Sequence, residues 1–318
     1  MDQQSQAEAC ATMSMDLLTE KLRRDGNLVG MKTRPARALI GWMPEREAQI
    51  LLGIPHTPVT PLPEHVRRVE EARAAVRARP AGVDQKNILS DIGEELLAYS
   101  AEFQNQPSYK PFRAIGCTIR MANLNEICAL QPLVHLDYLE HAERFRNLLQ
   151  QAVQDDMISL ARIALPISAP AELAAQFDRQ KNAWIHESSN PDARIVGPFN
   201  ARVEVAPGLF AMGYGFCIAP LPSFVQVVLY RGRYFLKDGY HRTLALLQKG
   251  ITRVPVVFQE ILESQNLDVE GRFSDEIILG PHPPLLPDYL RDDVAAAGLH
   301  LAIQKTIVIQ STENQTWG

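Results

Sequence analysis

Two hydrophobic periods divide the chain near residue 190. Before this point apolar residues recur mainly every three or four positions, the period of helices with one buried face. After it, short apolar runs are separated by glycine and proline, as in strands joined by turns. The pattern predicts an α+β fold, in which a helical N-terminal region packs on a C-terminal mixed β-sheet. We expect a flexible leader (1–30), a helical domain (31–190) and a strand-rich domain with a C-terminal strand extension (191–318).

The helical domain is predicted to contain a series of short helices. Pro44 can begin one and Gly53 can end it, because proline fits the first helical position and glycine the position after the last. Apolar spacing predicts further helices at residues 65–79, 88–102, 119–130 and 134–157. Another is expected to begin at Pro170 and to carry Phe177 and Trp184.

The strand-rich domain is predicted from its short apolar runs and turn residues. Strands are expected at residues 195–196, 203–205, 209–212, 216–218, 225–230, 233–236 and 254–258. Arg231-Gly232 predicts a tight hairpin between two of them. Near the C-terminus we expect a short helix at residues 289–297 and a last strand at residues 306–310, docked on the sheet of this domain.

Composition and charge narrow the function classes. The chain has 318 residues, a net charge of −5 and 46% hydrophobic residues, so it can bury a core but does not coat nucleic acid non-specifically. No apolar run reaches the eighteen or so residues of a membrane span, and the N-terminus lacks a signal-peptide pattern. We therefore expect a cytoplasmic protein without a membrane partner.

Cysteine and histidine spacing gives no metal site. The four cysteines, Cys10, Cys117, Cys128 and Cys217, are scattered and contain no closely spaced pair, so we expect thiols without a disulfide framework. His135 and His141 are six residues apart and do not share a helix face in the manner of a metal-binding pair.

The chemistry of the sequence is concentrated in the turn Asp238-Gly239-Tyr240-His241-Arg242-Thr243. Gly239 permits a positive φ or close approach of a ligand where a strand gives way to a helix. The first amides of that helix, at Tyr240–Thr243, have no intrahelical acceptor, and the helix dipole adds partial positive charge there. Such a helix start is suited to binding an anion.

The side chains of the turn can add to an anion site. Arg242 has the planar fork that binds phosphate through two hydrogen bonds, and the Thr243 hydroxyl can donate to an oxygen or reach a magnesium ion. Asp238 can hold a metal ion or act as a base, and His241 can donate to phosphate or transfer a proton. The structural alternative is that Asp238 caps the helix, Gly239 makes a turn, and His241 and Arg242 pack locally.

The turn, a short helix, Gly250 and the strand Val254-Pro255-Val256 resemble the ParB/sulfiredoxin-like superfamily over about residues 199–263. The resemblance implies binding of nucleotide phosphates at the turn. Partition proteins bind CTP, sulfiredoxins bind ATP, and a free serine kinase branch with a D-G-H-H-R turn uses ADP.

Departures from the family patterns narrow the branch. Sulfiredoxin chemistry needs a cysteine where this chain has Tyr240, and partition proteins have a G-E-R-R type turn and a helix-turn-helix domain after it. The kinase-like branch matches best at Asp238, His241 and Arg242. That branch also needs an upstream glutamate, for which Glu204 is the candidate, with plain surface as the structural alternative.

These observations predict a nucleotide-binding protein that transfers or hydrolyses a phosphoryl group, with Mg²⁺ and a small-molecule acceptor as expected partners. Gly239, Tyr240, Arg242 and Thr243 would bind the phosphates, and Asp238, His241 and Glu204 would carry the chemistry, Asp238 also holding the metal. The alternative is a non-catalytic regulator that senses nucleotide and binds DNA or a protein through its helical half. The mixed-charge helix at residues 65–79 is the feature that favours this alternative.

Overall fold

The chain divides into two compact units. The computed structural model describes residues 33–53, 62–82, 85–136, 143–167, 176–188, 193–220, 223–263, 267, 269, 271–301 and 305–310. Unit 1 is formed by Met1–Pro166 and Phe224–Ala302, and unit 2 by Ile167–Ser223 and Ile303–Gly318.

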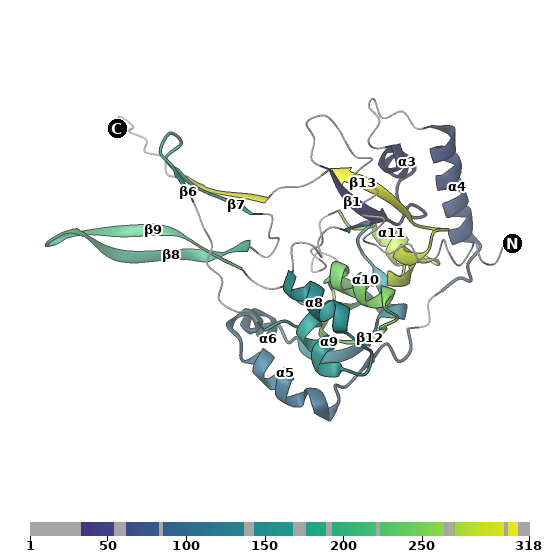
Figure 1. The fold of residues 1–318 in the computed structure, drawn as a ribbon, viewed down its shortest axis with the longest axis horizontal. Coiled ribbons are helices and arrows are strands. Elements are labelled where there is room, and N and C mark those ends of the chain that lie inside the picture. Colours follow the sequence, from purple (N-terminus) through teal and green to yellow (C-terminus); the bar gives the residue numbers. More distant parts are fainter. Residues whose placement is uncertain are drawn as a thin grey trace. The chain divides into compact units, whose positions relative to one another are not determined.

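Unit 1 is a mixed α+β structure in which helices and strands are interspersed along the chain (Figure 1). Its strands are β1 (Thr33–Ala38), β2 (Leu89–Ser90), β3 (Thr118–Asn123), β4 (Cys128–Ala129), β5 (Leu133–His135), β10 (Gln226–Tyr230), β11 (Arg233–Asp238), β12 (Arg253–Glu260) and β13 (Ala296–Leu301). Its α-helices are α3 (Glu45–Gly53), α4 (Pro63–Arg77), α5 (Leu97–Gln104), α6 (Lys110–Ala114), α8 (Glu143–Gln151), α9 (Met157–Ala164), α10 (Tyr240–Gln248) and α11 (Asp275–Ile278). Short 3₁₀ helices are η1 (Glu94–Leu96), η2 (Pro107–Tyr109), η3 (Leu124–Glu126) and η5 (Leu286–Leu290).

The main sheet of unit 1 has six strands in the order β2-β3-β12-β10-β11-β4. β10 and β11 form an antiparallel hairpin, and β12 returns parallel to β10 after α10. The central strands β10 and β12 are apolar on both faces, since the adjacent residues Val227 and Val228 are both buried, as are Val256 and Val257. This sheet carries the strand, turn, helix and strand in which the sequence concentrates its chemistry.

Helices cover the main sheet and close its core. α9 packs on β12 and also contacts α8 and α10, which lie beside it in Figure 1. Leu96, Met121 and Ala161, from η1, β3 and α9, form one buried cluster. A second, three-stranded sheet of order β13-β1-β5 is contacted by α3, where the Cβ of any residue replacing Gly298 would lie 3.2 Å from Leu51.

Unit 2 consists of strands in the residues that the structure describes. β6 (Gln176–Asp178), β7 (Ala183–Ser188) and β14 (Lys305–Gln310) form an antiparallel sheet of order β14-β7-β6. β8 (Ala193–Ala206) and β9 (Leu209–Pro220) form a long two-stranded hairpin.

Several predicted elements are confirmed. Helix α3 follows Pro44 and ends at Gly53, and α4 covers most of the predicted helix at residues 65–79. The strands around Arg231-Gly232 form the expected hairpin, with positive φ at both turn residues, as in a type I′ turn. The last strand is confirmed as β14, but its expected docking on the strands of residues 191–318 was wrong, because it pairs with β7 at Ala183–Ser188.

Other predicted elements were wrong, and the first half of the chain contains strands as well as helices. Residues 119–130, expected as a helix, form most of β3, then η3 and β4, because β3 has strand partners on both sides, β2 and β12. The helix predicted at residues 134–157 is replaced by β5, α8 and the start of α9, with residues 137–142 outside the described residues. Of the residues 88–102 that were predicted as one helix, Leu89–Ser90 form β2, and helical structure begins only with η1.

Two further errors lie in the later part of the chain. Phe177 and Trp184 lie on the paired strands β6 and β7 rather than on one helix, and their rings contact each other at 5.2 Å between centroids. Residues 168–175, including Pro170, lie outside the described residues. The helix predicted at residues 289–297 is replaced by the end of η5 and the start of β13.

Candidate functional site

The turn between β11 and α10 depends on glycine. Gly239 has a φ of 95° and is the N-cap of α10, as the sequence predicts for a strand-to-helix turn. A Cβ at this position would lie 2.9 Å from the Cα and Cγ2 atoms of Val225, so a side chain is excluded by packing as well as by conformation. α10 therefore begins with a cap that has no side chain to accept hydrogen bonds from its first amides.

Asp238 lies at the end of β11 beside an irregularity of the sheet. The pairing of β10 with β11 shifts register between Gln226 and Val227, and such bulges often lie next to functional sites. The Asp238 Oδ1 atom accepts a hydrogen bond of 2.7 Å from the Gly239 amide, and Oδ2 lies 3.5 Å from the Gln226 side-chain nitrogen. The carboxylate is partly exposed and stays in contact with the turn.

Tyr240 is a buried anchor of the turn. Its hydroxyl donates to the Leu236 carbonyl at 2.7 Å and accepts from the amides of Leu130 at 2.7 Å and Gln131 at 3.3 Å. Burial raises the pKa of the Tyr240 hydroxyl above its ordinary value. The side chain thus joins the end of β11 to the segment that follows β4.

Arg242 is buried and joins α10 to α9. Its Nη1 atom lies 3.1 Å from the Ile163 carbonyl oxygen and 3.4 Å from that of Ala164. These carbonyls belong to the last turn of α9, where a cation satisfies acceptors that have no intrahelical partner and complements the helix dipole. The phosphate contact expected for Arg242 stays a prediction, and the local structural use that the sequence left open is observed.

Thr243 and His241 differ in their surroundings. The Thr243 hydroxyl is buried, within 3.1 Å of the Gly239 carbonyl and 3.0 Å of the Tyr240 carbonyl, so it bonds back to its own helix. His241 is partly exposed as a residue, although its Nε2 atom is buried. Asp238 and His241 are therefore the two predicted site residues of the turn that are not fully buried.

Glu204 belongs to unit 2. It lies on β8, is exposed, and its Oε1 atom accepts a hydrogen bond of 2.9 Å from the Gly208 amide in the hairpin turn. This contact accounts for the carboxylate locally. A catalytic role for Glu204 stays a prediction.

Metal-binding residues do not cluster in the part of the chain that the structure describes. No group of three or more His, Cys, Asp and Glu side chains there could hold a metal ion. His135 Nε2 lies 3.3 Å from His300 Nδ1 across β1, while His141 is outside the described residues. Cys117 and Cys128 are buried thiols, and burial raises their pKa values to about 11 and about 12.

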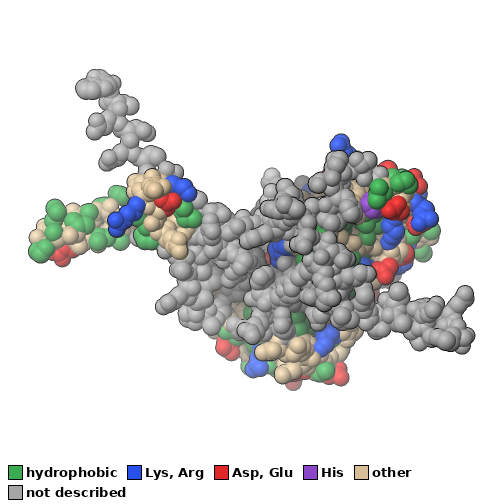
Figure 2. All heavy atoms as spheres, turned by 45° about the horizontal axis from the view of Figure 1, so that its top comes forward, with side chains coloured by type: hydrophobic (Ala, Val, Ile, Leu, Met, Phe, Trp, Pro, Cys, Tyr) green, Lys and Arg blue, Asp and Glu red, His purple; other side chains and the backbone are tan. Residues whose placement is uncertain are grey.

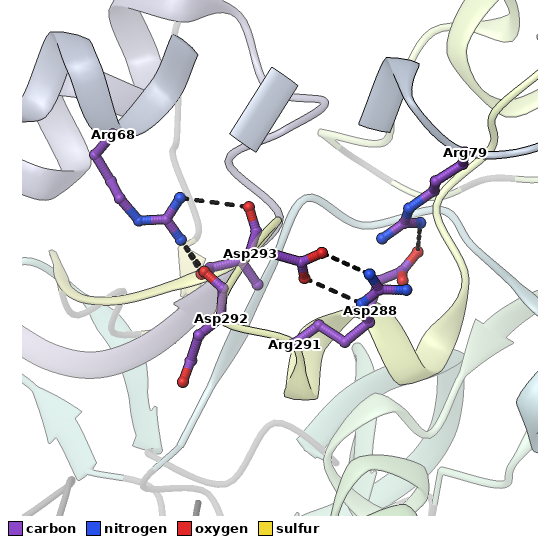
Figure 3. Close-up of polar contacts among 7 residues, drawn as sticks. Arg68, Arg79, Asp288, Arg291, Asp292 and Asp293 are labelled. Atoms are coloured by element: carbon purple, nitrogen blue, oxygen red, sulfur yellow. Dashed lines mark hydrogen bonds and ion pairs between the residues drawn. The ribbon is translucent and has the colours of Figure 1, made fainter. Parts of the chain in front are cut away.

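Arg68 of α4 and Arg79, two residues after its end, make contacts within unit 1 (Figure 3). Arg68 donates to the carbonyls of Asp292, Asp293 and Ala295, and Arg79 pairs with the buried Asp288 carboxylate at 2.8 Å. The Arg79 guanidinium also lies 5.0 Å from the centre of the Trp42 ring. These contacts dock α4 and the residues that follow it on η5 and on the segment between η5 and β13.

The same segment is stiffened by its own ion pair. The Arg291 guanidinium donates to both carboxylate oxygens of Asp293, at 3.0 and 2.5 Å, and this hydrogen bonding lowers the pKa of Asp293. Arg68 thus meets carbonyl groups of this segment, whereas Glu64, Arg67, Glu70, Glu71 and Arg77 of α4 are exposed. Binding of DNA or a protein by this helix stays a prediction.

Known proteins give no further guidance to the site. No family model, no curated protein and no solved structure matches the chain. Among the described residues, no helix is long and apolar enough to cross a membrane. The candidate site therefore rests on the geometry of the turn.

The contact partners of Tyr240 and Arg242 were missed from sequence because they are remote along the chain. Leu130, Gln131, Ile163 and Ala164 contribute backbone atoms, which have no residue signature. The one available signal was the neighbourhood of Tyr240 and Arg242 itself, since both lie among apolar residues of a short helix that must be covered on most sides.

Proposed function

We propose that the protein binds the phosphate groups of a nucleotide at the start of α10 and transfers or hydrolyses a phosphoryl group there. The observation that carries the proposal is the entry into α10, which follows a strand directly through a left-handed glycine that cannot be replaced. Helix starts of this kind present backbone amides and partial positive charge to an anion.

The residues of the turn would have different roles in binding the phosphate. Amides at the start of α10 would contact the phosphate, and the partly exposed His241 would donate to its oxygens through Nδ1, since Nε2 is buried. Arg242 would act as a positioning residue, because its guanidinium fixes the first turn of α10 to the end of α9. Tyr240 would fix the same turn from its other side.

Asp238 is the group proposed to carry the chemistry. Its carboxylate lies one residue from the helix start and is held by the Gly239 amide, so it can orient an attacking hydroxyl or water beside a bound phosphate. A single carboxylate also suits Mg²⁺, which commonly binds one or two carboxylates together with substrate phosphates and water. When bound, the metal would supply positive charge that stabilises the negative charge developing on the phosphoryl group.

The binding test uses His241→Asp. An acidic residue in the first turn of a helix stabilises the helix, so folding is retained, while its charge repels a phosphate at the same place. Thermal shift and calorimetry with ATP, ADP, CTP and GTP, with and without Mg²⁺, are expected to show one nucleotide that stabilises the wild type. The affinity of His241→Asp for that nucleotide should fall at least about tenfold.

A matched control is available on α4. His65→Asp makes the same change of residue and charge in the first turn of another helix of unit 1, and it should leave nucleotide affinity unchanged. Equal affinity in wild type and His241→Asp, or no shift with any nucleotide, contradicts the proposal.

The chemical step is tested with Asp238→Asn. Asparagine retains the shape and the acceptor for the Gly239 amide but removes the charge. Turnover of the bound nucleotide should fall about 100-fold or more, with binding largely retained. A wild type that binds nucleotide without turning it over with water or any acceptor tested would instead indicate the non-catalytic regulator.

A further inference from the structure

The hairpin of β8 and β9 exposes a row of large apolar side chains on one face. Phe210, Met212, Tyr214 and Phe216 alternate along β9, so they point to the same side of the two-stranded sheet. All four are exposed, Tyr214 to 78% and Met212 to 52%. We call this row the aromatic face, and the hairpin that carries it extends at the left of Figure 2.

The opposite face of β9 is different. Beyond Leu209 at the turn, which is 60% exposed, it carries Ala211, Gly213 and Gly215, which have little or no side chain to bury. A sequence that alternates large apolar residues with small ones has the pattern of a strand with one covered face. Monomeric proteins rarely expose apolar patches of this kind without a binding role.

The hairpin also needs support beyond its own pairing. Its sheet contains β8 and β9 alone among the described residues. Isolated two-stranded hairpins are at best marginally stable in water, and a covered apolar face is the usual source of their stability. The aromatic face is therefore the surface whose burial would stabilise unit 2.

The charges on the aromatic face complement one another. Arg202 lies opposite Met212 and Glu204 lies opposite Phe210, so both charged side chains share the side of the aromatic row. The Arg202 guanidinium lies 3.9 Å from the centre of the Phe210 ring. In a two-fold interface, residue i of one copy meets residue j of the other, and residue j of the first copy meets residue i of the second. A face that carries Arg202 and Glu204 side by side is therefore complementary in charge to its own copy.

We propose that the aromatic face is the contact surface of a homodimer, in which two hairpins pack face to face with Arg202 of each copy beside Glu204 of the other. Four side chains of this size, about half exposed, contribute roughly 400–500 Å² of apolar surface per copy. Together with polar neighbours this approaches the ~800 Å² per partner of a standard interface. The inference is independent of the nucleotide site.

The test begins with matched lysine substitutions in the full chain. Sedimentation velocity at about 20 µM, under reducing conditions that keep Cys217 from forming a disulfide, should show a dimer. Met212→Lys should weaken dimerisation at least about tenfold, since it buries a charge in the aromatic face. Val203→Lys is the control, because Val203 is 47% exposed on the opposite face of the same hairpin. This variant should dimerise as the wild type does.

Charge reversal tests the pairing itself. The Arg202→Glu chain carries two acidic residues at this place and the Glu204→Arg chain carries two basic ones, so each alone should be monomeric. An equimolar mixture of the two should form a heterodimer of near wild-type affinity, because every cross-copy pair is then attractive. Circular dichroism of each variant checks that it is folded.

Three results would overturn the proposal. A monomeric wild type at that concentration would mean that the face is covered by the same chain or by a different partner. A dimer insensitive to Met212→Lys would have another interface. A mixture of the charge-reversal variants that stays monomeric would exclude the face-to-face pairing.

Discussion

Two tyrosines next to glycines show how differently the two units use similar local sequence. Tyr240 follows Gly239 in unit 1, is buried, and exchanges hydrogen bonds with three backbone groups. Tyr214 lies between Gly213 and Gly215 in unit 2 and is exposed. The difference comes from distant segments, because Leu130 and Gln131 meet Tyr240, whereas Tyr214 lies on an exposed face. A residue's neighbours in sequence therefore do not tell whether it supports the fold or faces a partner.

The comparison extends to charge. Asp288 in unit 1 is buried against Arg79, while Arg202 and Glu204 in unit 2 are exposed on the aromatic face. In unit 1 substitutions should therefore change the stability of the fold, and on the hairpin they should change association. The following predictions test this contrast.

The largest effect is expected for Asp288→Ala. The change leaves the Arg79 guanidinium buried without its carboxylate and removes the acceptor of the Leu285 amide, so unfolding should become easier by about 3–5 kcal/mol. Urea denaturation followed by circular dichroism measures the change. Asp292→Ala is the control four residues on, since Asp292 is 86% exposed and its ion pair with Arg37 should contribute less than about 1 kcal/mol. Similar losses in both variants would contradict the assigned role of burial.

A smaller effect is expected for Tyr240→Phe. Removal of the hydroxyl leaves the buried Leu130 amide and Leu236 carbonyl without this partner, which should cost about 1–3 kcal/mol of stability. Tyr214→Phe, the equivalent change on the exposed hairpin, should stay within about 0.5 kcal/mol. A stability equal to wild type in Tyr240→Phe would show that the hydroxyl network is dispensable.

The smallest effect is expected from alkaline pH. Cys128 is buried with its pKa raised from 9.0 to about 12, mainly by desolvation, so the folded state keeps a proton that the unfolded chain loses. Stability is therefore complete below pH 9 and is lost as pH rises from about 9 towards 12. Between pH 8 and 10.5 the loss should be about 1–2 kcal/mol.

Cys128→Ala isolates this contribution. The variant removes the titrating thiol, so the decline of its unfolding free energy between pH 9 and 10.5 should be shallower than that of the wild type. Parallel curves would mean that Cys128 does not titrate differently in the two states. Tyr109, whose pKa is raised to about 12 by burial, accounts for part of the remaining slope.

The sequence predicted those parts of the fold that are specified by neighbouring residues. Pro44 and Gly53 set the ends of α3, and Arg231-Gly232 set the β10–β11 turn, because proline and glycine restrict or extend the backbone locally. The strand-to-helix turn at Gly239 was predicted for the same reason. Glycine itself permits the left-handed conformation of this turn, whatever its distant contacts are.

The errors arose where partners are remote. Residues 119–123 of β3 were interpreted as the start of a helix, because a short segment with apolar residues fits either period, and the pairing with β12 could not be inferred from it. In the candidate site, residue types were found but not their contacts. Arg242 has the chemistry of a phosphate ligand, yet its acceptors in the structure are two backbone carbonyls of α9. Backbone acceptors cannot be identified from residue types.

The pairing of β3 with β12 has a consequence for how the protein is made. Every residue of Thr118–Asn123 is matched with one in Arg253–Phe258, and the Val225 amide bonds the Ala164 carbonyl at 2.9 Å, where the chain leaves unit 1 and returns. On a ribosome, β3 therefore waits roughly 10 s for its main partner while all of residues 167–223 emerge. The first 166 residues present an unfinished sheet edge during that interval, and an unpaired edge is a site at which other chains can pair.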